Sequence, residues 1–152
     1  MTDPTASRPA LRVDDIFDIV AIDDSLVDLR ALESLVLQAY RPRSRLRPFL
    51  DLASALPSIT AFPPHLVIAD DRIGPASAEE TMTGLRAAGF DGPIAVVSGG
   101  GADGRAAELI AAGAIAYITK DELSLVRLLA LIDLAMDQSR LWGASRMGPE
   151  VD

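Results

Sequence analysis

The chain of 152 residues contains no cysteine and a single lysine, Lys120; every other basic side chain is arginine. Without cysteine, disulfide bonds and thiolate metal sites are excluded. No apolar run approaches the roughly 18 residues that cross a bilayer, and the N-terminus lacks the apolar segment of a signal peptide. We therefore expect a soluble, cytoplasmic protein without a membrane partner.

Positive charge is also scarce. The chain has 14 Lys and Arg against 22 Asp and Glu, a formal net charge of -8. No helix or surface stripe is rich in basic residues, so a nucleic-acid partner is not expected. The arginines at 41, 43, 45 and 47 are interpreted as a solvated edge, with a phosphate- or partner-binding patch as the alternative. The hydrophobic fraction of 49% is sufficient for one packed domain.

Short apolar runs alternate with segments of helical period along most of the chain. Residues 1–14 are predicted to be a disordered N-terminal tail, residues 15–141 a single domain, and residues 142–152 a flexible C-terminal tail. Within the domain, a proline at position 57 is expected to interrupt or end the second helix. The predicted strands cover residues 16–22, 45–49, 65–70, 94–98 and 114–119. The predicted helices cover residues 25–40, 52–61, 78–88, 104–112 and 122–141.

Most of the predicted strands are continuous runs of Val, Ile and Ala. This composition is typical of strands buried on both faces of a parallel sheet. Alternation with helices and right-handed crossovers then predicts an α/β fold, a three-layer sandwich. In open sheets of this kind, ligands bind beyond the carboxyl ends of the strands.

Polar side chains follow four of these strands, where each strand ends. Asp23 and Asp24 follow the first strand, Asp70 the third, Ser98 the fourth and Lys120 the fifth. Three converging carboxylates repel one another, and Mg²⁺ held by carboxylates and water relieves this repulsion. A single lysine in an arginine-rich chain indicates a position that needs a compact ammonium. Taken singly, each of these residues also has an ordinary structural explanation. Asp23 and Asp24 fit helix capping, and Asp70 fits a turn that ends a strand. Ser98 fits a loop hydroxyl, and Lys120 fits a surface lysine.

Together, the four strand ends resemble a known family. The segments that carry the resemblance are IVAIDDS, HLVIADD, IAVVSGG and GAIAYITK. Over residues 16–138 they are similar in type and spacing to the receiver domains of two-component response regulators. The resemblance implies a flavodoxin-like (βα)5 sandwich with a five-stranded parallel sheet in the order 2-1-3-4-5.

The resemblance also implies roles for individual residues. Asp70 corresponds to the phosphoacceptor and Lys120 to the ammonium that pairs with it. Ser98 corresponds to the hydroxyl that bonds a phosphoryl oxygen, and Tyr117 to the aromatic that turns inward when Ser98 moves. The implied Mg²⁺ ligands are Asp23, Asp24, Asp70 and the backbone carbonyl of Arg72.

The implied function is that of a single-domain response regulator. A sensor histidine kinase or a histidine phosphotransfer protein would supply the phosphoryl group. Acceptance and autodephosphorylation would be self-catalysed, so the protein is not expected to be an enzyme with a separate substrate. Output would occur by protein–protein contact or by phosphate relay. The alternative is a receiver-like interaction module that works without phosphorylation.

Three residues depart from the family pattern. Asp71 follows the expected phosphoacceptor, and we interpret it as facing solvent at the end of the strand, with a second carboxylate near the pocket as the alternative. Arg72 is a candidate cover for the phosphoryl group. Asp121 stands where the family usually has proline, and it is a candidate cap for the last helix or a competitor of Asp70 for Lys120.

Two remote alternatives share part of this chemistry. Residues 99–104 read GxGxxG between a strand and a helix, as in dinucleotide-binding folds, but only one strand and one helix remain after them. An aspartate-nucleophile phosphatase of the haloacid dehalogenase type uses the same residue types. Its nucleophile lies on the first strand and its acidic pair comes last, which is the reverse of this chain.

The last predicted helix has apolar residues on two sides. One side is expected to pack on the sheet through Leu125, Leu128, Leu129, Ile132 and Met136. The other side is a candidate interface for a homodimer or a target protein. Its apolar residues are Leu123, Val126, Ala130 and Leu134.

Overall fold

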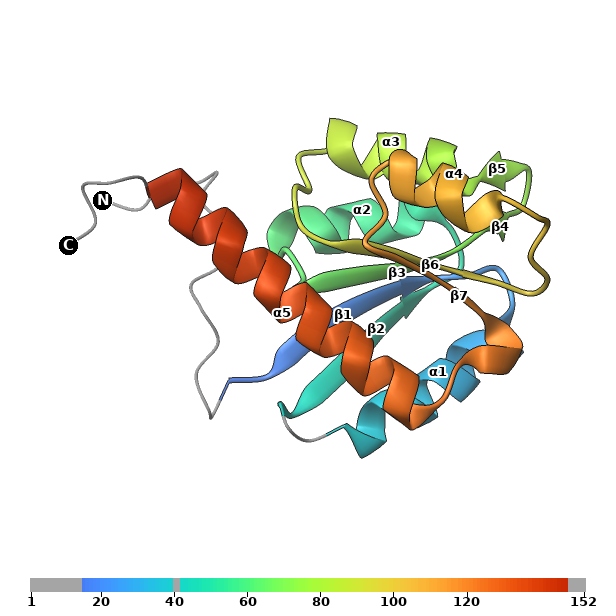
Figure 1. The fold of residues 1–152 in the computed structure, drawn as a ribbon, viewed down its shortest axis with the longest axis horizontal. Helices are drawn as coiled ribbons and strands as arrows, with labels where there is room; N and C mark the ends of the chain where they lie inside the picture. Colours follow the sequence, from blue (N-terminus) through green and yellow to red (C-terminus); the bar gives the residue numbers. More distant parts are fainter. Residues whose placement is uncertain (1–14, 40–41, 148–152) are drawn as a thin grey trace.

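The computed structural model describes residues 15–39 and 42–147, with side chains as far as residue 138. Its centre is a five-stranded parallel sheet in the order β2-β1-β3-β6-β7 (Figure 1). Counting these five strands along the chain gives the expected order 2-1-3-4-5, so the predicted flavodoxin-like fold is confirmed. The strands are β1 (Phe17–Ile22), β2 (Ser44–Phe49), β3 (Leu66–Asp70), β6 (Ile94–Ser98) and β7 (Ala116–Thr119).

Helices cover both faces of the sheet and complete the three layers. Figure 1 shows α1 and α5 on one face and α2, α3 and α4 on the other. The helices are α1 (Leu26–Gln38), α2 (Leu52–Ala61), α3 (Ala78–Ala87), α4 (Arg105–Ala111) and α5 (Leu125–Met147). Each face has its own apolar core, so the inner strands β1, β3 and β6 are buried on both sides.

Successive side chains of a strand enter opposite cores, which explains why these strands lack polar alternation. On β3, Ile68 belongs to the core beneath α1 and α5, whereas Val67 and Ala69 belong to the core beneath α2, α3 and α4. The same alternation continues past the end of the strand. It directs Asp70 to the α1 side and Asp71 to the α3 side.

A small hairpin not expected from the sequence follows β3. It consists of β4 (Arg72–Ile73) and β5 (Ala76–Ser77), paired antiparallel. Gly74 turns the chain with φ of +57°, in the left-handed region that favours glycine. The Gly74 N–H donates to Asp24 Oδ2 at 2.9 Å, which ties the hairpin to the end of β1.

Helix α2 is continuous through Pro57, so the expected interruption is wrong. Proline removes the N–H that would bond the Ala53 carbonyl four residues earlier. Ala53 and Pro57 are both exposed, and water can satisfy that carbonyl. The helix also has a firm start, because the Asp51 side chain accepts from the Ser54 N–H at 2.7 Å.

The last helix begins later than predicted. A 3₁₀ turn, η1 (Lys120–Glu122), follows β7, and the Ser124 side chain accepts from the Arg127 N–H at 3.2 Å. Ser124 therefore caps α5, and the expected cap at Asp121 is wrong. Helix α5 extends through Met147, past the expected boundary at residue 141. The predicted N-terminal tail and residues 148–152 lie outside the described residues.

Helix α5 buries one side and exposes another. Leu128 and Ile132 of the expected core face are buried, together with Leu131 and Ala135. The opposite side exposes Val126 and Leu134, while Leu123 is half-buried. In the described part of the chain, no helix is both long and apolar enough to cross a membrane.

Candidate functional site

The expected carboxylates meet at the carboxyl edge of the sheet. Ligand oxygens of Asp23, Asp24 and Asp70 all lie within 4.8 Å of one another. The ends of β1 and β3 bring them together, because these strands are neighbours in parallel register. As whole residues, Asp23 is 5% exposed and Asp70 is 9% exposed, whereas Asp24 lies at the surface.

The ammonium of Lys120 lies among carboxylates from three elements. Its Nζ is 3.4 Å from Asp70 Oδ2 and 2.9 Å from Asp23 Oδ2. A third carboxylate, Asp28 on the first turn of α1, is closer still, at 2.6 Å. The sequence prediction placed Lys120 beside Asp70 but did not include Asp28.

These contacts shift the proton affinity of both partners. Burial and the nearby charge of Asp23 raise the pKa of Asp70 to about 6, although Lys120 pulls it downward. Burial lowers the pKa of Lys120, but hydrogen bonds to Asp28 and Asp23 outweigh it and hold that pKa above its ordinary value. The lysine is therefore an ammonium throughout the neutral range.

The three carboxylates could hold a divalent metal ion. Their donors are hard oxygens, which Mg²⁺ prefers, and their spacing lets three of them face one ion. Burial is the largest cause of the raised pKa of Asp70 and the charge of Asp23 the second, and a bound cation would offset both. The residues present therefore fit a magnesium site.

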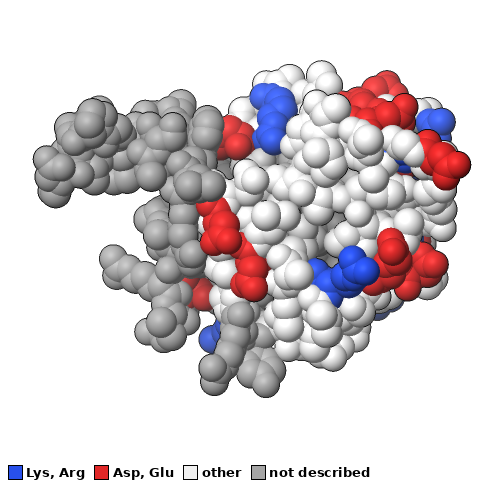
Figure 2. All heavy atoms as spheres, viewed as in Figure 1, with Lys and Arg blue, Asp and Glu red and all other residues white. Residues whose placement is uncertain are grey.

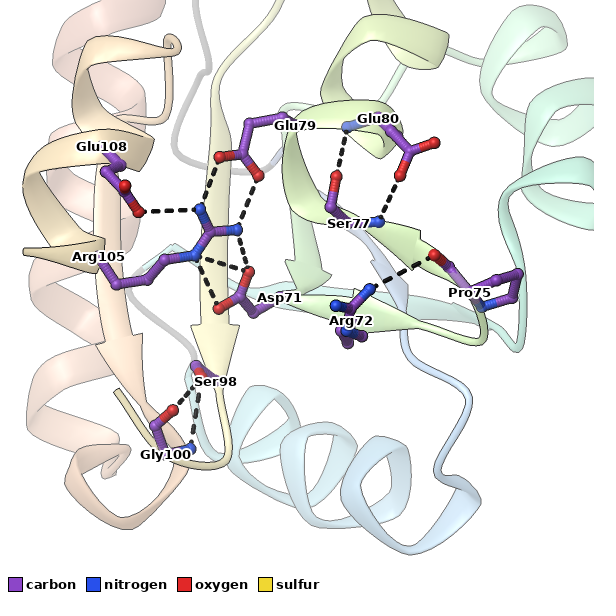
Figure 3. Close-up of polar contacts among 10 residues, drawn as sticks. All are labelled: Asp71, Arg72, Pro75, Ser77, Glu79, Glu80, Ser98, Gly100, Arg105 and Glu108. Carbon is purple, nitrogen blue, oxygen red and sulfur yellow. Dashed lines mark hydrogen bonds and ion pairs between the residues drawn. The ribbon is translucent and has the colours of Figure 1, made fainter. Parts of the chain in front are cut away.

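Arg72 lies in β4, two residues after Asp70. Its exposed guanidinium donates to the Pro75 carbonyl at 3.4 Å, within its own hairpin (Figure 3). This contact does not support the expectation that Arg72 covers the site. Ligation of a metal by its backbone carbonyl stays a prediction.

Ser98 ends β6 and is 4% exposed. Its hydroxyl donates to the Gly100 carbonyl at 3.1 Å and accepts from the Gly100 N–H at 3.3 Å (Figure 3). The hydroxyl is thus engaged by its own loop. It would have to exchange these bonds to reach a group on Asp70.

Tyr117 on β7 packs against the core beneath α2, α3 and α4. Its hydroxyl is buried and has no hydrogen-bond partner among the described residues. A Cβ on Gly101 would lie 2.8 Å from that hydroxyl. The absence of a side chain at Gly101 therefore leaves room for the tyrosine beneath the loop.

Asp71 does not face solvent, so the interpretation made from the sequence is wrong. It forms an ion pair with Arg105 at the start of α4, and the same guanidinium reaches Glu79 on α3 at 2.6 Å (Figure 3). The Asp71 and Arg105 side chains are each 18% exposed. The residue after Asp70 is thus bound to α4, and through Arg105 it is linked to α3, a relationship that neither periodicity nor motif spacing indicated.

Solved structures are similar to this fold over most of its length. A response regulator receiver domain protein from Clostridium thermocellum is 18% identical, over 82% of this chain and 98% of that chain, with a TM-score of 0.71. The beryllofluoride-activated NtrC4 receiver domain dimer is 17% identical, over 80% and 98%, with a TM-score of 0.70. No protein-family model matches the sequence, and no match to a curated protein is found.

The chain has the receiver-domain fold. A further similar structure is NtrX from Brucella abortus, solved with ADP, which is 27% identical over 82% of this chain with a TM-score of 0.68. This chain spans 27% of the length of that NtrX chain. The receiver fold confirms the family resemblance of the four sequence segments at the level of architecture.

Proposed function

We propose that this protein is a response regulator that accepts a phosphoryl group on Asp70. The observation that carries the proposal is the position of the Lys120 ammonium, 3.4 Å from Asp70 within the cluster formed by Asp70, Asp23 and Asp24. The receiver fold supports a signalling role of this kind. The phosphoryl donor would be a histidine kinase or a histidine phosphotransfer protein, so the protein acts as an acceptor and not as an enzyme on a separate substrate.

The transfer is a displacement at phosphorus. A carboxylate oxygen of Asp70 forms the new O–P bond while the P–N bond of the donor phosphohistidine breaks. The electron pair of that bond stays on the imidazole nitrogen. In the transition state, negative charge spreads over the three equatorial phosphoryl oxygens, so positioning and neutralisation provide most of the catalysis.

Each side chain has a defined task in this proposal. Lys120 neutralises one phosphoryl oxygen, and the Ser98 hydroxyl donates to another after leaving Gly100. Asp23, Asp24 and Asp70 would hold Mg²⁺, which supplies charge neutralisation at the phosphoryl group when bound. The backbone carbonyl of Arg72 is the further ligand expected from the resemblance.

The product would act as a switch because it carries nearly two negative charges on a formerly single carboxylate. Attraction of Ser98 and Lys120 toward the phosphoryl group would pull the loop after β6. Tyr117 lies directly beneath that loop at Gly101, so movement of the loop reaches its hydroxyl.

Output would use the face that holds α4, β7 and α5. The middle of this face is largely uncharged (Figure 2), and Val126 is 76% exposed on α5. The similar NtrC4 receiver domain was solved as a dimer. A second copy of this chain or a target protein would therefore bind along Leu123, Val126, Ala130 and Leu134. A protein that stays monomeric with and without beryllofluoride at high concentration would exclude the dimer.

The test is incubation with acetyl phosphate and Mg²⁺, followed by intact-mass measurement. We expect one added phosphoryl group on the wild-type protein and none on Asp70→Asn. The matched control is Asp71→Asn, which removes the adjacent carboxylate from the other side of the strand and should still be labelled. Chelation of divalent metal should abolish labelling.

Full labelling of Asp70→Asn would overturn the assignment of Asp70. A wild-type protein that stays unlabelled, yet binds a partner through α4, β7 and α5, would favour the interaction module that works without phosphate.

A further inference from the structure

The ammonium of Lys120 is shared unequally among its three carboxylates. Asp28 Oδ2 lies 2.6 Å from Nζ and accepts a hydrogen bond from it, while Asp70 Oδ2 lies at 3.4 Å. We propose that Asp28 is a positioning residue, which holds Lys120 toward α1 and competes with Asp70 for its charge. This inference rests on the proposed function, because it concerns the same phosphoryl-accepting site.

The backbone of α1 fixes Asp28 in place. Ser25 caps the helix, and its side chain accepts from the Asp28 N–H at 3.2 Å. Asp28 therefore stands on the first turn of a 13-residue helix, next to the end of β1. Its carboxylate reaches across to Lys120, which lies 92 residues later in the chain.

Asp28 lies outside the candidate metal cluster, which consists of Asp23, Asp24 and Asp70. Its side chain is 40% exposed, compared with 7% for Asp23 and 12% for Asp70. Loss of its charge therefore leaves the metal ligands intact and removes one of the three carboxylates that hold the ammonium, while Asp23 at 2.9 Å and Asp70 at 3.4 Å remain. This separation distinguishes a holding role from a metal-binding role.

Lys120 has room to change partners. Asp23, Asp28 and Lys120 are the polar residues around a cavity of about 120 Å³ between α1 and the sheet. The rest of its lining is apolar, including Leu29, Leu32, Val97 and Leu123. The aliphatic stem of the lysine can lie along this lining while its ammonium moves between Asp28 and Asp70.

Competition for one ammonium predicts the direction of the effect. A phosphoryl group on Asp70 must draw Lys120 away from Asp28, and this exchange weakens binding of the group. A partly exposed ion pair contributes up to about 1 kcal/mol. Removal of the Asp28 charge should therefore strengthen phosphoryl binding and speed labelling by about two- to fivefold.

The single lysine makes the test direct. Protein labelled with ¹³C at lysine Cε has one such signal, that of Lys120. Beryllofluoride, a phosphoryl mimic, is titrated in the presence of Mg²⁺ while this signal is followed. The same proteins are labelled with acetyl phosphate, and Mg²⁺ affinity is measured separately.

Three variants separate the contact from net charge and from folding. Asp28→Asn should shift the Lys120 signal, bind beryllofluoride more tightly and label about two- to fivefold faster, with unchanged Mg²⁺ affinity. Asp121 is exposed, and among the described residues Lys120 forms its ion pairs with Asp23, Asp28 and Asp70 and not with Asp121. Asp121→Asn therefore removes one charge beside Lys120 without touching these contacts and should behave like wild type. Asp28→Glu keeps a carboxylate and should restore the wild-type rate.

The outcomes distinguish this inference from the proposed function. If wild type is labelled at Asp70 but Asp28→Asn is labelled no faster than Asp121→Asn, the competition is overturned and the proposed function stands. An equal shift in Mg²⁺ affinity and labelling would also overturn it, because Asp28 would then act through the metal. If wild type is not labelled at all, both fall together.

Discussion

Arg105 and Asp71 form a side-on ion pair that connects the end of β3 to the start of α4. Arg105 Nε lies 3.1 and 3.2 Å from the two carboxylate oxygens of Asp71. The same guanidinium bonds both oxygens of Glu79, at the start of α3. Because Asp71 directly follows Asp70, the candidate acceptor is one residue away from a cluster that anchors two helices.

Arg105→Ala should lower the free energy of unfolding by about 1–2 kcal/mol, because it leaves Asp71, Glu79 and Glu108 facing one another without a cation. Urea denaturation measures the loss. Arg72→Ala, in the exposed hairpin, is the control and should change stability by less than about 0.5 kcal/mol. High salt should reduce the difference in unfolding free energy between Arg105→Ala and Arg72→Ala, because it screens the ion pairs. Equal losses in the two variants would contradict the cluster's role.

A second ion pair lies at the other end of the sheet. Asp18 is 1% exposed, and Arg47 bonds its two oxygens at 3.2 and 3.0 Å while also reaching α2 at Ser58. Arg47→Ala should cost about 3 kcal/mol, since it removes two charge-assisted hydrogen bonds from a buried carboxylate. Arg45 contacts the same carboxylate at 3.5 Å but is 58% exposed. Arg45→Ala should therefore cost less than about 1 kcal/mol in thermal or urea unfolding.

If the two arginine variants are equally stable, the Arg47 pair is worth no more than a surface contact.

The glycines after β6 differ in what surrounds them. A Cβ on Gly101 would meet the Tyr117 hydroxyl at 2.8 Å, whereas nothing lies within 4 Å of one on Gly100. Gly101→Ala should displace the Tyr117 ring and lower stability by about 1 kcal/mol. Gly100→Ala should be neutral. Ring proton shifts of Tyr117 in NMR spectra report the displacement, and unchanged shifts in Gly101→Ala would refute it.

The pKa of Asp70 predicts how pH affects metal-free protein. Its folded value of about 6 lies above the usual unfolded value of about 3.9, so the folded state binds more protons between these limits. The contribution of Asp70 to the free energy of unfolding should therefore rise as the pH falls from 6 to 4. At pH 7 the ionised side chain opposes folding, and Asp70→Asn should be more stable by about 1 kcal/mol after discounting for solvent.

This difference should vanish near pH 4, as measured by urea unfolding in a chelator. An Asp70→Asn variant that is less stable than wild type at both pH 7 and pH 4 would contradict the predicted direction of the effect.

The sequence was sufficient for the five strands of the parallel sheet and for the site residues at their ends, but not for the hairpin of β4 and β5. Continuous apolar runs, such as residues 94–97 ahead of Ser98, are typical of strands buried on both faces, and parallel strands place their carboxyl ends on one edge. Lys120 and Asp70 could therefore be placed together although they lie 50 residues apart. Pro57 was misjudged, because its cost depends on whether water reaches the Ala53 carbonyl, and that depends on the helix orientation.

The partners of charged side chains were not predictable in the same way. Asp28 and Arg105 lie on helices, where charged residues are usually solvated. Their contacts depend on how α1 and α4 sit against the sheet edge. One signal was available for Asp28: it lies three residues after the capping Ser25, in the turn that must leave β1 beside Asp23. The topology therefore indicated that Asp28 lies near the site, but it did not indicate that Lys120 is its partner.

The most direct measurement locates the modified residue. After acetyl phosphate treatment, borohydride reduces an aspartyl phosphate to homoserine, and peptide mass spectrometry identifies its position. We expect homoserine at position 70 in the presence of Mg²⁺ and none in its absence. Homoserine at position 23, 24 or 71, or at no position in folded protein with Mg²⁺ present, would contradict phosphoryl acceptance by Asp70.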